Sequence, residues 1–317
     1  MPSDLSKTAS PADQAAIPPV PRNNVLQGIG WMLVTGFLFV AVTGIVRHLG
    51  SDMPAIEAAF IRYALGLLLI LPFLFKLTRQ RIEPDVMKLY AARGLVHGIA
   101  VMLWFFAMAR IPIAEVTAIG YTAPIYVTIG AAFFLGEKLQ VRRVVAIMVG
   151  LTGSLVILRP GFQEINAGQL AQVVAAPLFA ASFILAKKLT DRADPAIIVG
   201  MLSVFCTIVL LPGAILQWRD PTLEEVLWLA LTAVFATTGH YTLTKAFRAA
   251  PITVTQPIAF LQLLWAALLG MAVFDEALDP FVFLGGAIVI GAATYISHRE
   301  TLAARRRKQL EAETPSA

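Results

Sequence analysis

The chain has 317 residues, of which 58% are hydrophobic and only 14% are charged, and its mean hydropathy is +0.75. Soluble domains are about half apolar and about a quarter charged, so these values exclude a water-soluble fold and favour a protein of the bilayer. The formal net charge of +5 does not predict nucleic-acid binding, because the basic residues are spread between apolar runs and form no single stripe.

Apolar runs follow one another along the chain, each close to the roughly 20 residues that a helix needs to cross a hydrocarbon core. They predict helices near residues 26–46, 55–75, 89–109, 113–135, 141–158, 169–186, 196–216, 226–245, 253–274 and 281–297. The predicted fold class is an all-α integral membrane protein with ten transmembrane helices. Residues 1–25, rich in proline, are expected to form a disordered cytoplasmic tail, and residues 298–317 a basic cytoplasmic tail.

The basic residues are distributed unevenly between the two sides of this arrangement. With a cytoplasmic N-terminus, most loop cations lie inside, and the outside loops hold only Arg47, Arg110, Arg159 and Arg219. Cytoplasmic loops of membrane proteins carry the excess of Lys and Arg. The pattern therefore predicts a multi-pass protein of the cell (inner) membrane with both termini in the cytoplasm.

The chain contains an internal repeat. Residues 91–157 align with residues 230–296 at a constant offset of 139, which places Pro112 on Pro251 and Glu137 on Glu276. The preceding helices align at an offset of 140 to 141. The first repeat covers residues 26–158 and the second 168–297, with five spans each. An odd number of spans requires the second copy to insert upside down, and such inverted repeats are typical of secondary transporters.

Several motifs resemble those of EamA-type drug/metabolite transporters. These are the stretch from Ile111 to Pro124, the run Phe134–Lys138 and the Phe60–Tyr63 segment with its arginine. The following helix, with Gly150 and Gly153, is also similar, whereas the second repeat diverges at Asp275 and Ser203.

This resemblance implies two EamA repeats around a central cavity and transport driven by an electrochemical gradient. The absence of a Gly-rich phosphate loop ending in Gly-Lys-Ser/Thr agrees with a transporter that does not use ATP. Family substrates include amino acids and related metabolites, drugs, nucleotide-like cofactors and riboflavin. The cavity would be lined by the segments 26–46, 89–109, 113–135, 169–186, 226–245 and 253–274.

Two histidines are the leading candidates for substrate binding. Arg93, His97 and Trp104 recur on one face of the helix predicted at 89–109. His240 lies one turn beyond Ala236, the repeat partner of His97, so both histidines are expected to face one cavity. Because histidine titrates near physiological pH, the pair could bind an anionic or hydrogen-bonding substrate or carry a coupling proton. Alternatively, each histidine bonds only a neighbouring helix.

Prolines within two of the spans point to further substrate-binding positions. Pro124 and Pro257 free backbone carbonyls inside the bundle, and such interruptions often mark a site near the membrane midplane. A flat substrate could stack on the aromatic and amide side chains around them, which are Trp31, Tyr121, Tyr241, Gln256, Phe260 and Gln262.

Three charged residues, together with Pro124 and Pro257, are assigned structural or gating roles. Arg62 lies about two turns inside its span, where a pairing with Glu57 or with a carbonyl is expected. Glu137 and Glu276 occupy equivalent positions in the two repeats and are expected to anchor the loops that follow them.

The sequence therefore predicts a secondary transporter of a small organic metabolite, with riboflavin or a similar aromatic metabolite as the leading substrate. Alternatives are an amino-acid or drug/metabolite exporter, an S-adenosylmethionine transporter and a lipid-linked flippase. A membrane enzyme would require an Asp-rich or His-Asp motif, and a channel would require filter motifs; neither is found. No cofactor, metal ion or nucleic-acid partner is expected, and a homodimer remains open. The single cysteine, Cys206, excludes an intrachain disulfide.

Overall fold

The computed structural model describes residues 25–50, 52–74, 82–123, 125–126, 141–159, 164–190, 192–250, 255, 258–259 and 261–313. The regular elements in these ranges are all helices. They are α1 (Val25–Leu49), α2 (Ala55–Leu74), α3 (Pro84–Met108), α4 (Ile113–Gly120), α6 (Val141–Leu158), α7 (Ala167–Thr190), α8 (Pro195–Leu216), α9 (Leu223–Ala249), α11 (Leu261–Phe274) and α12 (Pro280–Glu313).

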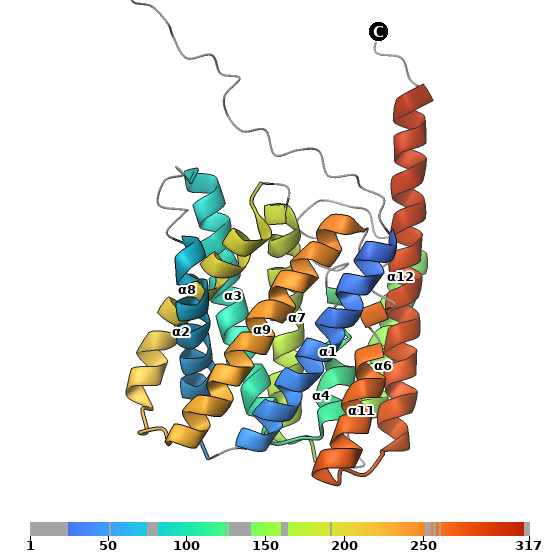
Figure 1. Ribbon diagram of the computed structural model, residues 1–317. Coiled ribbons are helices and arrows are strands. Elements are labelled where there is room, and N and C mark those ends of the chain that lie inside the picture. The colour runs from blue at the N-terminus through green and yellow to red at the C-terminus, as the bar shows by residue number, and fades with distance from the viewer. Residues whose placement is uncertain are drawn as a thin grey trace, which may run out of the picture.

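The helices form one bundle with their axes roughly along a common direction (Figure 1). Helix α1 begins and α12 ends at the same end of the bundle, which we call the terminal end; the other end, where α1 stops and α12 starts, is the opposite end. Helix α7 begins at the opposite end, so it runs antiparallel to α1, its counterpart in the first repeat.

The helix boundaries agree closely with the predicted spans. Helix α6 occupies the predicted range, and most others extend by a few residues at one or both ends. The largest difference is at α12, which continues through the basic C-terminal segment to Glu313. The described part of the predicted span 113–135 ends its first helix at Gly120, and α11 begins only at Leu261.

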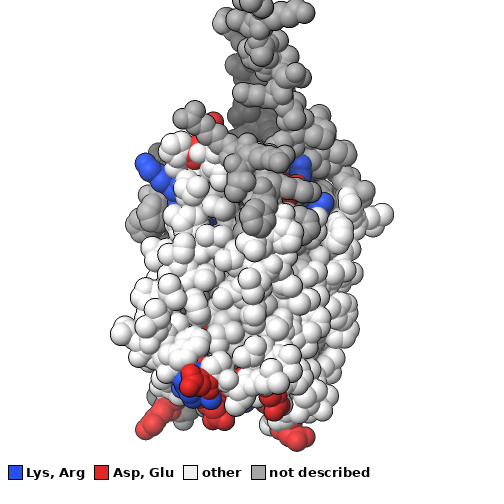
Figure 2. All heavy atoms as spheres, turned by 60° about the vertical axis from the view of Figure 1, so that its left-hand side comes forward, with Lys and Arg blue, Asp and Glu red and all other residues white. Residues whose placement is uncertain are grey.

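The surface of the bundle has the character of a membrane protein. Six described helices are long and apolar enough to cross a bilayer, and shorter apolar helices cover Val144–Leu158, Leu261–Phe274 and Pro280–Tyr295. Figure 2 shows charged side chains gathered toward the two ends of the visible face, with a nearly uncharged band between them. Large apolar side chains such as Leu68 and Leu155 are exposed. The chain is therefore a multi-pass membrane protein.

The helix packing has the symmetry expected of two inverted copies. Helix α1 packs against α9, and α3 packs against α7. Because α7 corresponds to α1 and α9 to α3, exchanging the repeats converts one of these contacts into the other. Helix α2 packs against its own counterpart α8, and α6 against its counterpart α12. The elements near the middle of the bundle therefore come equally from both halves.

Glycines allow two pairs of helices, α6 with α12 and α3 with α8, to approach each other unusually closely. A Cβ atom added at Gly153 of α6 would lie 2.8 Å from the Gly285 carbonyl oxygen, and one added at Gly285 of α12 would lie 2.5 Å from that of Gly153. At the α3–α8 contact, a Cβ atom at Gly94 would lie 2.1 Å from Phe205 Cβ. Small residues of this kind let helix backbones approach each other within a bilayer.

Candidate functional site

A cavity of about 520 Å³ lies inside the bundle, between the two repeats. Its wall is formed mainly by α1, α2, α3, α4, α7 and α9, with contributions from α11 and α12. Ligand cavities of about 300–1,000 Å³ accommodate a small organic molecule. Of the predicted site residues, the wall includes Arg62, His97, Trp104, Tyr121, His240 and Gln262.

The two histidines meet at the cavity wall. The ring centroids of His97 on α3 and His240 on α9 are 5.2 Å apart, with an interplanar angle of 72°. His97 Nδ1 forms a hydrogen bond of 2.9 Å with the buried Ser182 hydroxyl on α7. Within the described part of the chain, His97 Nε2 and His240 Nδ1 have no hydrogen-bond partner. Both nitrogens are buried at the edge of the cavity, without a partner among these residues.

Aromatic rings surround this pair. His97 lies edge-on to Tyr63 and Phe179, at centroid distances of 6.2 and 5.3 Å, and Phe39 lies 5.2 Å from His240. Phe179 also stacks on Phe183 one turn further along α7, with centroids 6.2 Å apart and an angle of 17°. Aromatic pairs of these geometries suit a wall that receives a flat ring.

Arg62 is buried beside the cavity and is not paired with Glu57. Its guanidinium carbon lies 3.9 Å from the centroid of the Tyr63 ring, and Nη1 has no partner within the described residues. The predicted pairing with Glu57 is wrong because five helical residues correspond to about 140° of rotation and about 7.5 Å of rise. Glu57 Oε2 instead accepts a hydrogen bond of 3.1 Å from the Arg219 amide.

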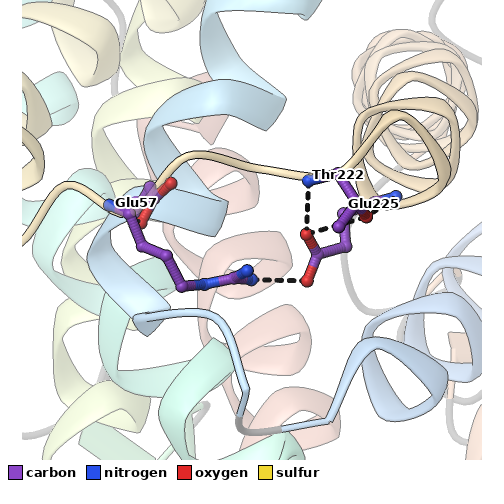
Figure 3. A network of polar contacts seen from close by, with 4 residues as sticks. Glu57, Thr222 and Glu225 are labelled. Atoms are coloured by element: carbon purple, nitrogen blue, oxygen red, sulfur yellow. Dashed lines mark hydrogen bonds and ion pairs between the residues drawn. The ribbon is translucent and has the colours of Figure 1, made fainter.

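Glu57 is part of a polar network at the opposite end. Figure 3 shows it beside Thr222 and Glu225, where α9 begins. The Thr222 hydroxyl accepts from the Glu225 amide, and the Glu225 carboxylate accepts from the Thr222 amide and from the Arg219 guanidinium. This reciprocal capping box fixes the start of α9 and holds the preceding loop against α2.

Three predicted site residues lie away from the cavity wall. Trp31 and Tyr241 are each next in sequence to a lining residue, and one residue corresponds to about 100° of helix rotation. Trp31 packs beside the Leu243 and Phe247 cluster, and the Tyr241 ring faces Lys245. Arg93 shares a helix face with His97 but lies one turn further toward the terminal end, where its Nη1 donates to the Ile198 carbonyl of α8.

Five other predicted residues lie outside the described ranges. They are Pro124, Glu137, Gln256, Pro257 and Phe260. Their assigned roles in substrate binding and gating stay predictions.

Several wall residues were not singled out from the sequence. They are Tyr63, Phe179, Phe183, Gln172, Lys187 and Lys188. A signal for three of them is present, because Phe179, Phe183 and Lys187 recur at four-residue spacing on one face of α7. Tyr63 directly follows Arg62 and carries no comparable spacing signal.

An ion pair closes the opposite end of the bundle. Arg47 Nε of α1 lies 2.9 Å from Glu276 Oε1, and the Ile113 amide at the start of α4 donates to Glu276 Oε2 at 2.9 Å. We call this group, made of Arg47, Glu276 and the Ile113 amide, the latch. The neighbouring side chains of Met108, Ile111 and Ile113 are fully buried, so the chain packs closely around the latch.

The terminal end contains the repeat counterpart of a further contact of Arg47. Arg47 Nη1 also donates to the Met108 carbonyl at 3.2 Å, and Lys187 Nζ donates to the Phe247 carbonyl at 3.3 Å. Lys187 is 140 residues after Arg47, and Phe247 is 139 residues after Met108, so the same contact occurs once in each repeat. Lys187 lines the cavity together with the exposed Lys188, which shows that the cavity extends to the terminal end.

Comparison with family models identifies both halves of the chain. The EamA-like transporter family matches residues 26–159 and again residues 166–298. Among the described residues, no group of three or more His, Cys, Asp or Glu side chains could hold a metal ion.

Two classes of curated relatives cover almost the whole chain. A riboflavin transporter of Vibrio cholerae is 29% identical over 91% of this chain and 99% of its own length. An S-adenosylmethionine uptake transporter of Rickettsia bellii is 28% identical over 86% and 94%, and a riboflavin transporter of Rhizobium johnstonii is 28% identical over 89% and 94%. A crystal structure with 18% identity aligns over 85% of this chain and 96% of its own, with a TM-score of 0.56, and supports the fold alone.

Proposed function

Because the chain belongs to the EamA-like transporter family, we propose that it is a secondary transporter that moves a small organic metabolite through the central cavity by alternating access. The family and the relatives make it a membrane transporter of small molecules and not an enzyme. The proposed architecture is ten transmembrane helices in two inverted repeats, with residues 26–158 and 168–297 as the two units.

The strongest support for alternating access is that equivalent cations of the two repeats lie in different surroundings. At the opposite end, Arg47 is held by Glu276, which also binds the Ile113 amide. At the terminal end, the equivalent Lys187 lines the cavity. Two similar halves can exchange such arrangements, which would close one end while the other opens.

Riboflavin, or a similar flat aromatic metabolite, is the proposed substrate. Stacked and edge-on rings around His97 and His240 suit a planar ring, and a turn of the imidazole rings would present their two unpartnered nitrogens to its polar edge. Two of the relatives are named riboflavin transporters. The S-adenosylmethionine transporters among the relatives make that molecule the second candidate.

The proposed location is the cell (inner) membrane, with the terminal end in the cytoplasm. The Lys and Arg distribution along the sequence supports this orientation. A reporter fused after Ala317 is then cytoplasmic, and a periplasmic signal would overturn both the orientation and the helix count.

Binding and transport of flavins by the purified protein test the proposed substrate. A ligand at about ten times its Kd raises the free energy of unfolding by about 1.4 kcal/mol, which a thermal-shift assay detects. We expect riboflavin to stabilise the protein and to enter proteoliposomes with saturable kinetics. Stabilisation by S-adenosylmethionine or amino acids alone would assign a different substrate. Silence across flavins, S-adenosylmethionine, amino acids and nucleosides would favour a lipid substrate.

A further inference from the structure

The charge on the cavity wall has one sign. Among the described lining residues the cations are Arg62, Lys187 and Lys188, and none is an aspartate or a glutamate. Low-dielectric walls focus the field of fixed charges into a cleft and raise the local concentration of ligands of opposite sign. The cavity is therefore suited to anions and unfavourable to cations.

Among the residues that the structure describes, Lys187 is a cation without a counter-ion. Its equivalent Arg47 makes the same type of backbone contact but is neutralised by Glu276, at 2.9 Å. Lys187 Nζ donates to the Phe247 carbonyl, and no described carboxylate forms an ion pair with it. A partly buried ammonium that lacks a partner is destabilising. An anionic group in the cavity would supply that partner.

The face of α7 places this cation beside an aromatic surface. Phe179, Phe183 and Lys187 follow one another at four-residue intervals, which is about 6 Å of rise per step. All three line the cavity, and the two phenyl rings are stacked. A flat ring that lies against Phe183 would direct a substituent toward Lys187 one turn further on.

From these observations we propose that Lys187 determines specificity, selecting an aromatic substrate that carries a negatively charged group. This inference rests on the proposed transport function and restricts the class of substrate to aromatic anions. It ranks ligands of the same ring by charge, with anionic ligands bound more tightly than neutral ones and cationic ligands bound least. S-Adenosylmethionine, which has a sulfonium centre and a net positive charge, belongs to the disfavoured class.

A matched pair of flavins tests the role of Lys187. Riboflavin and riboflavin 5′-phosphate share a ring system and differ by the charged phosphate, and their Kd values can be measured by quenching of flavin fluorescence on the full-length protein in nanodiscs. We expect the phosphate to bind about tenfold more tightly to the unmodified protein, which corresponds to about 1.4 kcal/mol. Lys187→Gln should abolish that preference, because it weakens binding of the phosphate more than binding of riboflavin. Lys187→Glu should reverse it.

Arg192→Gln is the control for net charge. Arg192 lies in the α7–α8 loop at the same end, is exposed and pairs with Asp85, so its loss should keep the preference. Equal binding of the two flavins, or a preference that survives in Lys187→Gln, would overturn the inference and leave the proposed function intact.

A second matched pair separates the inference from the flavin assignment. If neither flavin binds, adenosine and adenosine 5′-monophosphate are compared in the same variants. A preference for the monophosphate that depends on Lys187 would support the inference and overturn riboflavin as substrate. Absence of binding for both pairs would overturn the inference together with the flavin assignment.

Discussion

His97 and His240 place two hydrogen-bonding nitrogens in an apolar, aromatic setting. Buried polar atoms in folded proteins nearly always have a partner, and leaving one without a partner costs about 1–3 kcal/mol. His97 Nε2 and His240 Nδ1 are buried without one among the described residues. A substrate that reaches both nitrogens when the imidazole rings turn would recover this cost, so the pair can favour binding of a polar ring edge over an apolar molecule of the same size.

Replacing either histidine should therefore impair transport. We expect His97→Ala and His240→Ala each to lower the uptake rate by about tenfold or more at limiting substrate, with unchanged amounts of protein in the membrane. His48→Ala is the matched control, because His48 is exposed at the opposite end, where its ring lies edge-on to the Trp228 ring. Uptake at the unmodified rate in both cavity variants would contradict the assignment of the site.

At this scale the sequence predicts polar residues better than aromatic ones. Histidine and arginine are rare in spans, so His97, His240 and Arg62 could be selected, and all three line the cavity. The only sequence signal for Phe179 is its four-residue spacing with Phe183 and Lys187, and phenylalanines that face lipid or pack between helices can show the same spacing. Lys187 was counted only as an orienting charge at a helix end, because sequence cannot show that the cavity reaches it.

Helices α6 and α12 pack through backbone as much as through side chains. Gly153 and Gly285 face each other so closely that a methyl group at either position meets the other's carbonyl oxygen at less than 3 Å. Dispersion contacts and close backbone approach stabilise helix pairs in a bilayer, where the hydrophobic effect contributes little between helices. These glycines therefore set the distance between the last helix of each repeat.

A methyl group at this contact should weaken the pair. We expect Gly285→Ala to lower the free energy of unfolding by about 1–3 kcal/mol, as overpacking of a filled interior does. Gly291→Ala, on the same helix but with nothing within 4 Å of the added Cβ, should change it by less than about 0.5 kcal/mol. Thermal unfolding in detergent measures both. Equal melting temperatures of the two variants would show that the contact between α6 and α12 accommodates the methyl group without loss of stability.

Most helices could be placed from hydropathy because each is bounded by charged or Pro-containing segments. The exception is α12, whose basic C-terminal part is too polar for a span and is nevertheless helical to Glu313. A high fraction of good helix formers there, including Ala, Arg, Lys, Gln and Glu, explains the continuation. Hydropathy measures where the bilayer ends and carries no information on where the helix ends.

At the scale of the molecule, the repeat offset predicts which helices pack together. The exchange of α1–α9 for α3–α7, and the pairing of α2 with α8, follow from two inverted copies around one axis. The offset could not show which end is closed, since both copies contain the same kind of cation and carbonyl contact. That depends on where the Glu276 side chain lies, and the sequence alone does not specify its partners.

Breaking the latch should open the opposite end of the bundle. A cysteine at Thr117, which lines the cavity on α4, reports access for a membrane-impermeant maleimide added from the side of the opposite end. We expect Glu276→Gln to raise the labelling rate about tenfold, because loss of about 1.4 kcal/mol from the closed state shifts the population by that factor. Cys206, the native cysteine, is fully buried and should not react.

The matched control breaks another ion pair at the same end. Arg159 and Asp279 join α6 to the start of α12, and neither lines the cavity. Asp279→Asn should leave the labelling rate of the Thr117 cysteine unchanged. A labelling rate that does not respond to Glu276→Gln would show that the packed side chains of Met108, Ile111 and Ile113 close this end without the latch.

The two repeats have different cations at equivalent positions, so the contacts that close the two ends during the transport cycle differ in strength. The Arg47 guanidinium binds Glu276 and the Met108 carbonyl at once, whereas Lys187 is a compact ammonium that makes a single backbone contact. The two facing directions are then unequal in energy, and the empty protein spends more of its idle time facing the terminal side. Substrate in the compartment on that side therefore meets the binding-competent empty protein more often. The ratio of maleimide labelling from the two sides measures the fraction of empty protein that is open to each side.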